Sequence, residues 1–199
     1  MFDVENQAAR GQQPAERVGH GEGDALAVGL VSCLPAPIGE PGQSKVDPQL
    51  VGYWLNQPKD GKRMMALVAP FDEHAYVIHL VEYKSDDGKV SDKEHMVLKG
   101  WLTEIKGEKL LCTEVVEQLV DKDNKDRTYP TLRVRLKDDT LTSASLKPDS
   151  AALKGMKTTA ELTEAITKNL DQAEMYDEEQ TWKRLDPAKD DDLIRSVMK

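Results

Sequence analysis

The hydrophobic pattern divides the chain into a polar leader, a long region of short apolar runs and one amphipathic stretch near the C-terminus. The apolar runs are rich in Val, Ile, Leu and Tyr, and turn signals such as Asp-Gly, Lys-Gly and Asp-Asp separate them. Runs of this kind, bounded by turn residues, are typical of β-strands. We expect seven strands, at residues 50–56, 64–69, 75–83, 95–105, 109–116, 131–137 and 141–146. Because no helical period lies among them, they predict an antiparallel meander.

The run at 131–137 shows the strand period most clearly. Leu132, Val134 and Leu136 alternate with Arg133 and Arg135. Successive side chains of a strand point to opposite faces, so the leucines and the valine share one face and the arginines the other. This predicts a sheet with one buried and one more polar face.

A helix is expected after the last of these strands. Thr158 and Glu161 have the spacing of a capping box, in which each side chain bonds a backbone N–H at the helix start. The following apolar residues recur at helical spacing: Leu162, Ala165, Ile166, Leu170 and Ala173. Residues 180–185 are predicted to form a short final strand. The predicted fold is therefore mainly β: an antiparallel up-and-down sheet that curls to a small barrel, closed by the helix around 159–173.

Composition limits the domain count and the class of partner. The chain has 199 residues, 32% of them charged and 5% aromatic, with a formal net charge of −9. We expect a disordered leader at 1–47, one domain at 48–186 and an acidic tail at 187–199 that frays. An acidic surface repels phosphate backbones, which argues against nucleic acid as the main partner.

Two cysteines lie in different settings, and a disulfide between them is not expected. Cys112 falls in a predicted strand and is interpreted as a small buried residue. Cys33 ends the sequence Leu-Val-Ser-Cys, which resembles the bacterial lipobox, where a leader is cut and the cysteine receives lipid. A Pro/Gly spacer at 35–42 follows. The resemblance implies a signal peptide and a lipid anchor in the bacterial cell envelope.

Two features of the leader keep another interpretation open. The apolar run before Cys33 is short, and the segment before that run is net acidic. The alternative is an ordinary leader on a soluble cytoplasmic protein. No run approaches the roughly 18–20 apolar residues of a spanning helix, so we expect no integral membrane segment.

Gly52-Tyr53-Trp54 opens the first strand, and the order of hairpins, helix and closing strand follows it. This arrangement resembles the lipocalin-like (calycin) β-barrel, as found in bacterial lipoproteins of unknown function. The resemblance covers about residues 47–185, and the second lipocalin signature, Thr-Asp-Tyr, has no match. It implies that Trp54 plugs one end of the barrel and that Arg184 stacks on it. It also implies a small apolar ligand in the lumen.

Four residues of the predicted strands are candidate ligand contacts: Met64, Tyr76, Met96 and Trp101. Flexible thioethers can line an adaptable cavity, but they also fill gaps in solid cores. The alternative is therefore a solid-core domain of the envelope that has a structural role or docks an envelope protein. An apolar lumen of about 300 Å³ or more favours ligand binding. A filled barrel with a large exposed apolar patch favours a protein partner.

No catalytic or cofactor motif rises above background. His74 and His79 are five residues apart and point to opposite faces of a strand, and no Cys or Asp follows at the intervals of zinc sites. We interpret them, with His95, as surface or rim histidines. The glutamates of the strands form no selected acid/base pair, and there is no Gly-x-Ser-x-Gly elbow or Gly-rich phosphate loop. We expect no enzyme activity, metal or cofactor.

Overall fold

The computed structural model describes residues 33–56, 62–86, 88–120 and 127–199. The leader at 1–32, with the first three residues of the lipobox, lies outside the described residues. The expected turn at 57–61, Asp87 and the loop at 121–126 also lie outside them.

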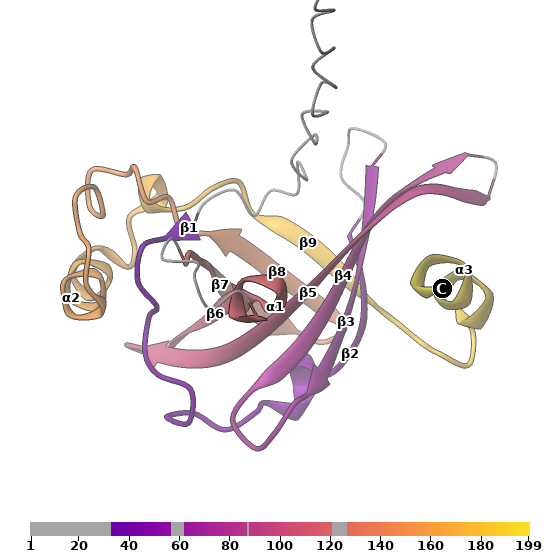
Figure 1. Cartoon of the computed structure of the whole chain (residues 1–199), viewed down its shortest axis with the longest axis horizontal. Coiled ribbons are helices and arrows are strands. Elements are labelled where there is room, and N and C mark those ends of the chain that lie inside the picture. Colours follow the sequence, from indigo (N-terminus) through magenta and orange to yellow (C-terminus); the bar gives the residue numbers. More distant parts are fainter. Residues whose placement is uncertain (1–32, 57–61, 87, 121–126) are drawn as a thin grey trace, which may run out of the picture.

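The main body is a closed antiparallel barrel (Figure 1). Each of its eight strands pairs with the next along the chain, and the last pairs with the first. The strands are β2 (Gly52–Asn56), β3 (Lys62–Pro70), β4 (Tyr76–Asp86), β5 (Lys89–Ile105), β6 (Glu108–Val115), β7 (Tyr129–Lys137), β8 (Thr140–Ser145) and β9 (Gln180–Leu185). The predicted fold class is confirmed: the seven expected strands correspond to β2–β8, and the closing strand is β9.

The largest difference from the predicted strands is at β5, which begins at Lys89 instead of at residue 95. Its first residues are mostly polar and exposed, so they carry no hydrophobic alternation. They form a strand because they pair with the end of β4, beyond a register shift between Glu82 and Lys84. Backbone hydrogen bonds extend this hairpin, and the pattern of side chains does not predict that extension.

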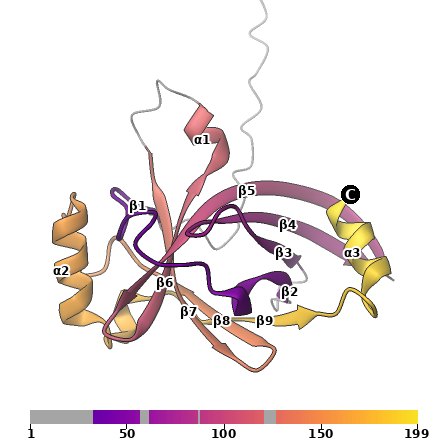
Figure 2. The ribbon, with the colours of Figure 1, turned by 90° about the horizontal axis from the view of Figure 1, so that it is seen from below.

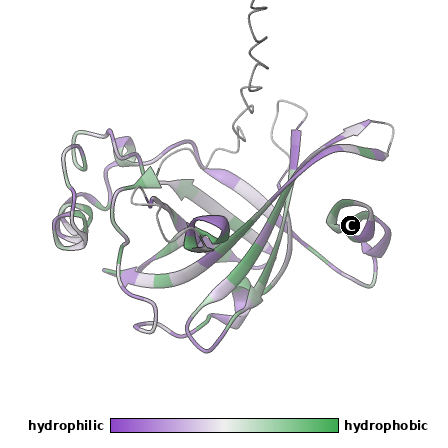
Figure 3. Cartoon of the chain, in the orientation of Figure 1, coloured by the Kyte–Doolittle hydropathy of each residue, from purple (hydrophilic) through white to green (hydrophobic). Residues whose placement is uncertain are grey.

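Alternate side chains of the strands fill the barrel interior, and hydropathy alternates along the ribbon (Figure 3). The arginines of β7 point outward, as expected: Arg133 stacks on Tyr176, and Arg135 forms an ion pair with Glu108. The buried interior residues are Leu50, Trp54, Met64, Ala66, Val68, Tyr76, Ile78, Leu80, Leu98, Leu102, Val134 and Trp182. The barrel interior is thus one hydrophobic core, and two further clusters lie on the outer face of the sheet.

The predicted helix is α2 (Thr159–Asn169), and its capping box at Thr158 and Glu161 is confirmed. The expectation that it closes the barrel is wrong, because it packs on the outer face. Its buried residues Leu162 and Ile166 belong to a cluster with Leu110 of β6. A helix with one apolar stripe must cover an apolar surface, and the outer face of β5, β6 and β8 provides one.

The segment after the leader is part of the fold, which corrects the expected tether. β1 (Cys33–Leu34) pairs with the start of β7. Leu34 and Ile38 are fully buried in the cluster under α2. Trp101 Nε1 and Thr103 Oγ1 both donate to the Ile38 carbonyl, each at 3.1 Å. The 3₁₀ helix η1 (Pro48–Leu50) then leads into β2.

The expected fraying tail is also wrong, because residues 191–198 form the helix α3 (Asp191–Met198). Its Ile194 and Val197 are buried against Met65 and Val81 on the outer face of the sheet. α3 and α2 lie on opposite sides of the barrel (Figures 1 and 2). The short elements α1 (Val116–Val120) and η2 (Ala173–Met175) follow β6 and α2.

Candidate ligand-binding site in the barrel lumen

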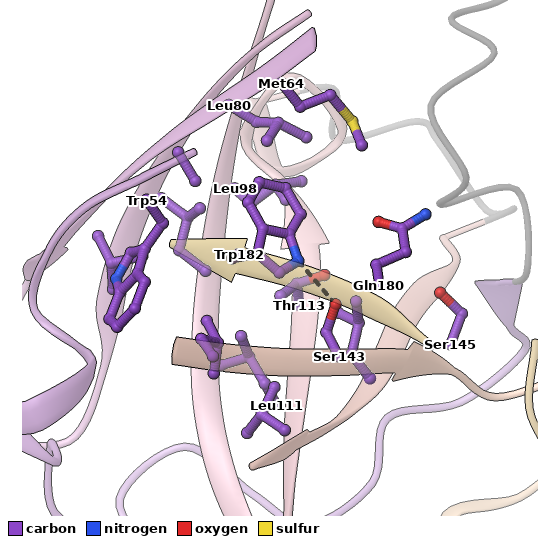
Figure 4. A pocket seen from close by; sticks show the side chains of 16 residues that line it. Trp54, Met64, Leu80, Leu98, Leu111, Thr113, Ser143, Ser145, Gln180 and Trp182 are labelled. Carbon is purple, nitrogen blue, oxygen red and sulfur yellow. Dashed lines mark hydrogen bonds between the residues drawn. The ribbon is translucent and has the colours of Figure 1, made fainter. Parts of the chain in front are cut away.

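An apolar cavity of about 90 Å³ lies inside the barrel (Figure 4). Every strand of the barrel contributes to its wall. The lining residues are Trp54, Met64, Ala66, Val68, Ile78, Leu80, Leu98, Leu111, Thr113, Leu132, Val134, Leu141, Ser143, Ser145, Gln180 and Trp182. A larger groove beside β9 has charged walls that include Asp139 and Lys189. The lumen is therefore the place where an apolar molecule would be shielded from water.

Trp54 seals one end of the lumen, here called the Trp54 end. Its ring is fully buried, and its Nε1 donates to the Leu50 carbonyl of η1 at 2.8 Å. The hydrogen bond satisfies the one polar atom of a large apolar side chain. The 3₁₀ helix is thereby fixed under the barrel.

Arg184 holds the same end together from β9. Its guanidinium carbon lies 4.2 Å from the centroid of the Trp54 ring, the stacking that the lipocalin resemblance implied. One guanidinium nitrogen donates to the Val51 carbonyl at 2.7 Å, and the other donates to the Gln49 carbonyl. Nε lies 3.4 Å from an oxygen of Asp139. One side chain thus joins β9, η1 and the turn before β8.

Asp47 links η1 to the barrel wall. Its Oδ1 accepts from the Gln49 amide at 2.9 Å, and its Oδ2 lies 2.6 Å from Lys109 Nζ. Burial raises the pKa of Asp47, but the hydrogen bonds from Lys109 and Gln49 outweigh it and hold the pKa below 3.8. The Asp47 amide donates to the buried Tyr76 hydroxyl at 2.6 Å. Burial raises the pKa of Tyr76 to about 12, so the phenol stays protonated.

The opposite end, here called the Gln180 end, carries polar side chains. Asn56, Met64 and Glu82 are register partners on β2, β3 and β4, so they share the lumen face. Asn56 Nδ2 donates to Gln180 Oε1 at 3.4 Å, a long hydrogen bond. Glu82 is buried and lies 2.7 Å from Lys62 Nζ. This end therefore offers donors and acceptors next to an apolar space.

Inside the cavity, the polar groups are hydroxyls and one amide. Trp182 Nε1 donates to Ser143 Oγ at 2.9 Å, and this bond is drawn in Figure 4. Thr113 Oγ1 donates to the Pro130 carbonyl at 2.9 Å. Gln180 and Ser145 lie on the far side of the cavity from Trp54 (Figure 4). The wall is thus apolar, with its polar atoms gathered toward one end.

The four predicted ligand residues do not meet in one place. Met64 lines the cavity. Tyr76 is buried in the interior, but it lies at the Trp54 end, where its hydroxyl is bonded to Asp47. Met96 packs against the interior cluster without lining the cavity. Trp101 is on the outer face of β5, under the Ile38 segment.

The sequence analysis missed Gln180, Trp182 and Ser143 as lining residues. A signal for two of them was present. Arg184 was expected to stack on Trp54, the plug of the barrel, and strand alternation places residues 180 and 182 on the same face as residue 184. Ser143 gave no such signal, because a serine in a strand is most often solvated.

Neither cysteine forms a disulfide. Cys112 is buried in β6 as expected, and burial raises the pKa of its thiol to about 11. Such a thiol is unreactive at neutral pH. Cys33 is partly buried in β1, with Pro130 as its register partner. The cysteine that ends the lipobox-like sequence therefore lies in β1, beside the start of β7.

His74, His79 and His95, the histidines within the described ranges, lie outside the lumen. His74 precedes β4, and its Nδ1 lies 3.1 Å from the Ser44 carbonyl. His79 and His95 contact each other on the outer face of β4 and β5. Among the described residues, no group of three or more His, Cys, Asp or Glu side chains is arranged to hold a metal ion. No helix in the described ranges combines the length and apolarity that crossing a bilayer requires.

Comparison with known proteins gives no family for the chain. No protein-family model matches it, and no curated protein or solved structure is significantly similar. The closed eight-stranded antiparallel barrel is consistent with a lipocalin-like architecture. The fold is thus established as a small β-barrel that could bind a ligand, and function must be argued from the lumen itself.

Proposed function

We propose that this chain is a binding module that holds a small apolar molecule in its barrel lumen, without catalysing a reaction on it. The observation that carries the proposal is the cavity of about 90 Å³ with an apolar wall and polar groups near one end. The polar lining groups Thr113, Ser143, Ser145 and Gln180 can donate and accept hydrogen bonds, but they include no carboxylate or imidazole for acid/base chemistry.

The cavity is smaller than the roughly 300 Å³ at which size alone would favour ligand binding, so its apolar wall is the support for binding and its size restricts the occupant. Ligand pockets for drug-sized molecules enclose about 300–1,000 Å³, and a cavity of about 150 Å³ in another protein binds benzene. A cavity of about 90 Å³ fits a molecule of a few heavy atoms or the end of one alkyl chain. Met64 lines the wall, and its flexible thioether lets the space adapt to the occupant.

The two ends of the lumen set the direction of entry. The Trp54 end is filled by the stacked pair of Trp54 and Arg184 and by η1. At the Gln180 end, the long bond between Asn56 and Gln180 can be exchanged for bonds to a ligand. The proposed ligand therefore enters at the Gln180 end with its apolar part first.

The alternative role, a solid-core domain that docks a protein, has less support. That role would be favoured by a large exposed apolar patch. Among the described residues, the exposed large hydrophobic side chain is Phe71, and Lys99 covers its ring from 5.6 Å. A single exposed side chain needs no partner to explain it.

The proposal also keeps Cys33 as the site of a lipid anchor, which would place the barrel in a bacterial cell envelope. Its support is the lipobox-like sequence that ends at Cys33. Because residues 33–34 pair with β7, such a lipid would hold the barrel close to the membrane, without a free spacer. A lipid-modified chain would be anchored without spanning the bilayer.

The binding test uses a space-filling variant of the lumen and a matched control on the same strand. Ala66 lines the cavity, whereas Ala69 does not and its alternation places it on the outer face. We would titrate benzene and 1-alkanols of increasing chain length and follow binding by NMR. We expect Ala66→Leu to weaken binding at least tenfold and Ala69→Leu to leave it unchanged. Equal binding by both variants would move the site out of the lumen, and no binding by the unmodified chain would favour the docking role.

The anchor is tested separately by the intact mass of the mature chain after expression in a bacterial host. A mass that fits a chain starting at a diacylated or triacylated Cys33 supports the anchor. An unmodified chain that keeps its leader removes the anchor and leaves the lumen proposal untouched.

A further inference from the structure

The outer face of β4 and β5 brings two histidines together. Ile78 and Leu80 of β4 point into the lumen, so His79 between them points outward. His79 pairs in register with Val97, and His95 pairs with Val81. His79 and His95 are therefore diagonal neighbours on the same face, at a separation that long side chains can bridge.

The two imidazoles converge through one nitrogen each. His79 Nε2 lies 3.0 Å from His95 Nδ1, and the ring centroids are 5.2 Å apart. In this hydrogen-bonded arrangement the two nitrogens point at each other, so each ring must turn about its side-chain bonds before both can face one ion. With the nitrogens 3.0 Å apart, an ion bound to both at about 2.05 Å would hold them at an angle of roughly 95°, which suits neighbouring positions of a square-planar or octahedral ion.

We propose that His79 and His95 form a surface site for one divalent transition-metal ion of tetragonal geometry, Cu²⁺ in preference to Ni²⁺. Imidazole nitrogen is a good ligand for both ions, and Cu²⁺ binds nitrogen sites more tightly than the other divalent ions of the first row. On binding, the hydrogen bond between the rings would break, and the ring that donates it would pass its proton through solvent to its own other nitrogen, so that both rings bind as neutral imidazoles. Water would occupy its remaining positions, because His95 is exposed to solvent.

The surroundings of the pair favour a bound cation. Both rings rise from neighbouring strands held by a continuous ladder, so the two side chains lie close together before the ion arrives. The net charge of −9 attracts cations to the surface in general.

The test is a titration of the full-length, untagged chain with CuSO₄ and NiSO₄, followed by calorimetry and, for Cu²⁺, by electron paramagnetic resonance. We expect one Cu²⁺ per chain with nitrogen coordination. His79→Gln and His95→Gln should each weaken the binding at least tenfold. His74→Gln and His20→Gln serve as controls, since neither residue belongs to the pair, and both should bind Cu²⁺ like the unmodified chain.

His79 and His95 lie on the outer face of the sheet, so we expect the substitutions to leave the barrel folded. Circular dichroism checks that every variant is folded. If His79→Gln and His95→Gln bind Cu²⁺ as tightly as the unmodified chain, the proposed site is wrong. Tighter binding of Ni²⁺ than of Cu²⁺ would overturn the proposed preference.

Discussion

The two ends of the barrel lumen are built on different principles. At the Trp54 end, Arg184 both stacks on the tryptophan and donates to two backbone carbonyls. At the Gln180 end, the bond between Asn56 and Gln180 is 3.4 Å long, and the partner of Glu82 is a lysine whose side chain is 39% exposed. Short hydrogen bonds to backbone carbonyls and a stacked ring hold side chains in place, whereas a long bond or a bond to an exposed, flexible lysine is easily exchanged. The comparison therefore assigns stability to one end and ligand exchange to the other.

The largest effect should come from Trp54→Ala. Removing a buried aromatic side chain costs about 3–5 kcal/mol through lost burial and the cavity left behind, and Arg184 would lose the ring on which it stacks. We expect this loss in the free energy of unfolding, measured with urea and far-UV circular dichroism. Trp54→Phe, which keeps most of the ring, should lose clearly less. Equal losses in the two variants would mean that ring volume is not what holds this end.

Arg184→Ala should have the next largest effect, about 2–3 kcal/mol, because hydrogen bonds from a charged donor contribute about 1.5–3 kcal/mol and the stacking contributes more. Arg184→Lys keeps the charge but cannot donate to the carbonyls of Gln49 and Val51 together while stacking. We expect Arg184→Lys to recover only part of the loss in the same urea titration. Full recovery would show that charge alone matters at this position.

A smaller effect should appear on acidification, at Asp47. Its pKa is lower in the folded chain than the ordinary 3.8, so its bonds to Lys109 and Gln49 stabilise the fold fully above that value. This stability is lost as the pH falls through the folded pKa. Asp47→Asn should therefore show a smaller loss of stability between about pH 5 and pH 2. Identical pH profiles of the variant and the unmodified chain would show that Asp47 does not contribute to the loss of stability in acid.

The smallest effect on stability should come from Gln180→Leu, at the other end. The lost bond is long, but its loss leaves the buried Asn56 amide without this partner, so the free energy of unfolding should fall by about 1 kcal/mol, less than at the Trp54 end. Binding should respond more: a 1-alkanol should lose affinity relative to benzene, which has no hydroxyl to bond. A loss of more than about 2 kcal/mol in stability would contradict the division between the two ends.

The strands and their order were predictable because they rest on local pattern, whereas the stacking of Arg184 on Trp54 was expected only from the lipocalin resemblance. Alternation along β7, the capping box of α2 and the Gly-x-Trp of β2 each lie within a few residues of sequence. α3 was missed because its apolar stripe is short and follows acidic residues. The stripe indicates a packed helix only once the outer face of the sheet is known to lie beside it. The buried part of residues 33–47 was missed because Pro and Gly are typical of linkers, and here they lead Leu34 and Ile38 into a cluster.

The candidate sites show the same limit. Gln180 and Trp182 could have been placed in the lumen from Arg184 by strand alternation alone. The contact between His79 and His95 could not, because spacing along the chain compares residues of one strand, and the two histidines meet across two strands. Trp101 was expected in the lumen, but the faces of β5 are both apolar, so the pattern of that strand does not say which is inside.

By itself, the sequence determined the meander of strands, the amphipathic helix and the acidic surface, because each follows from the spacing or charge of neighbouring residues. Only the tertiary structure decided which face of each strand became the lumen, where the helices pack and how much space is left inside. Those features depend on the register and closure of eight strands, which bring together side chains as distant in sequence as Trp54 and Arg184. The cavity volume is the small difference between the volume that the barrel encloses and the volume of the side chains that fill it. No short stretch of sequence can therefore predict it.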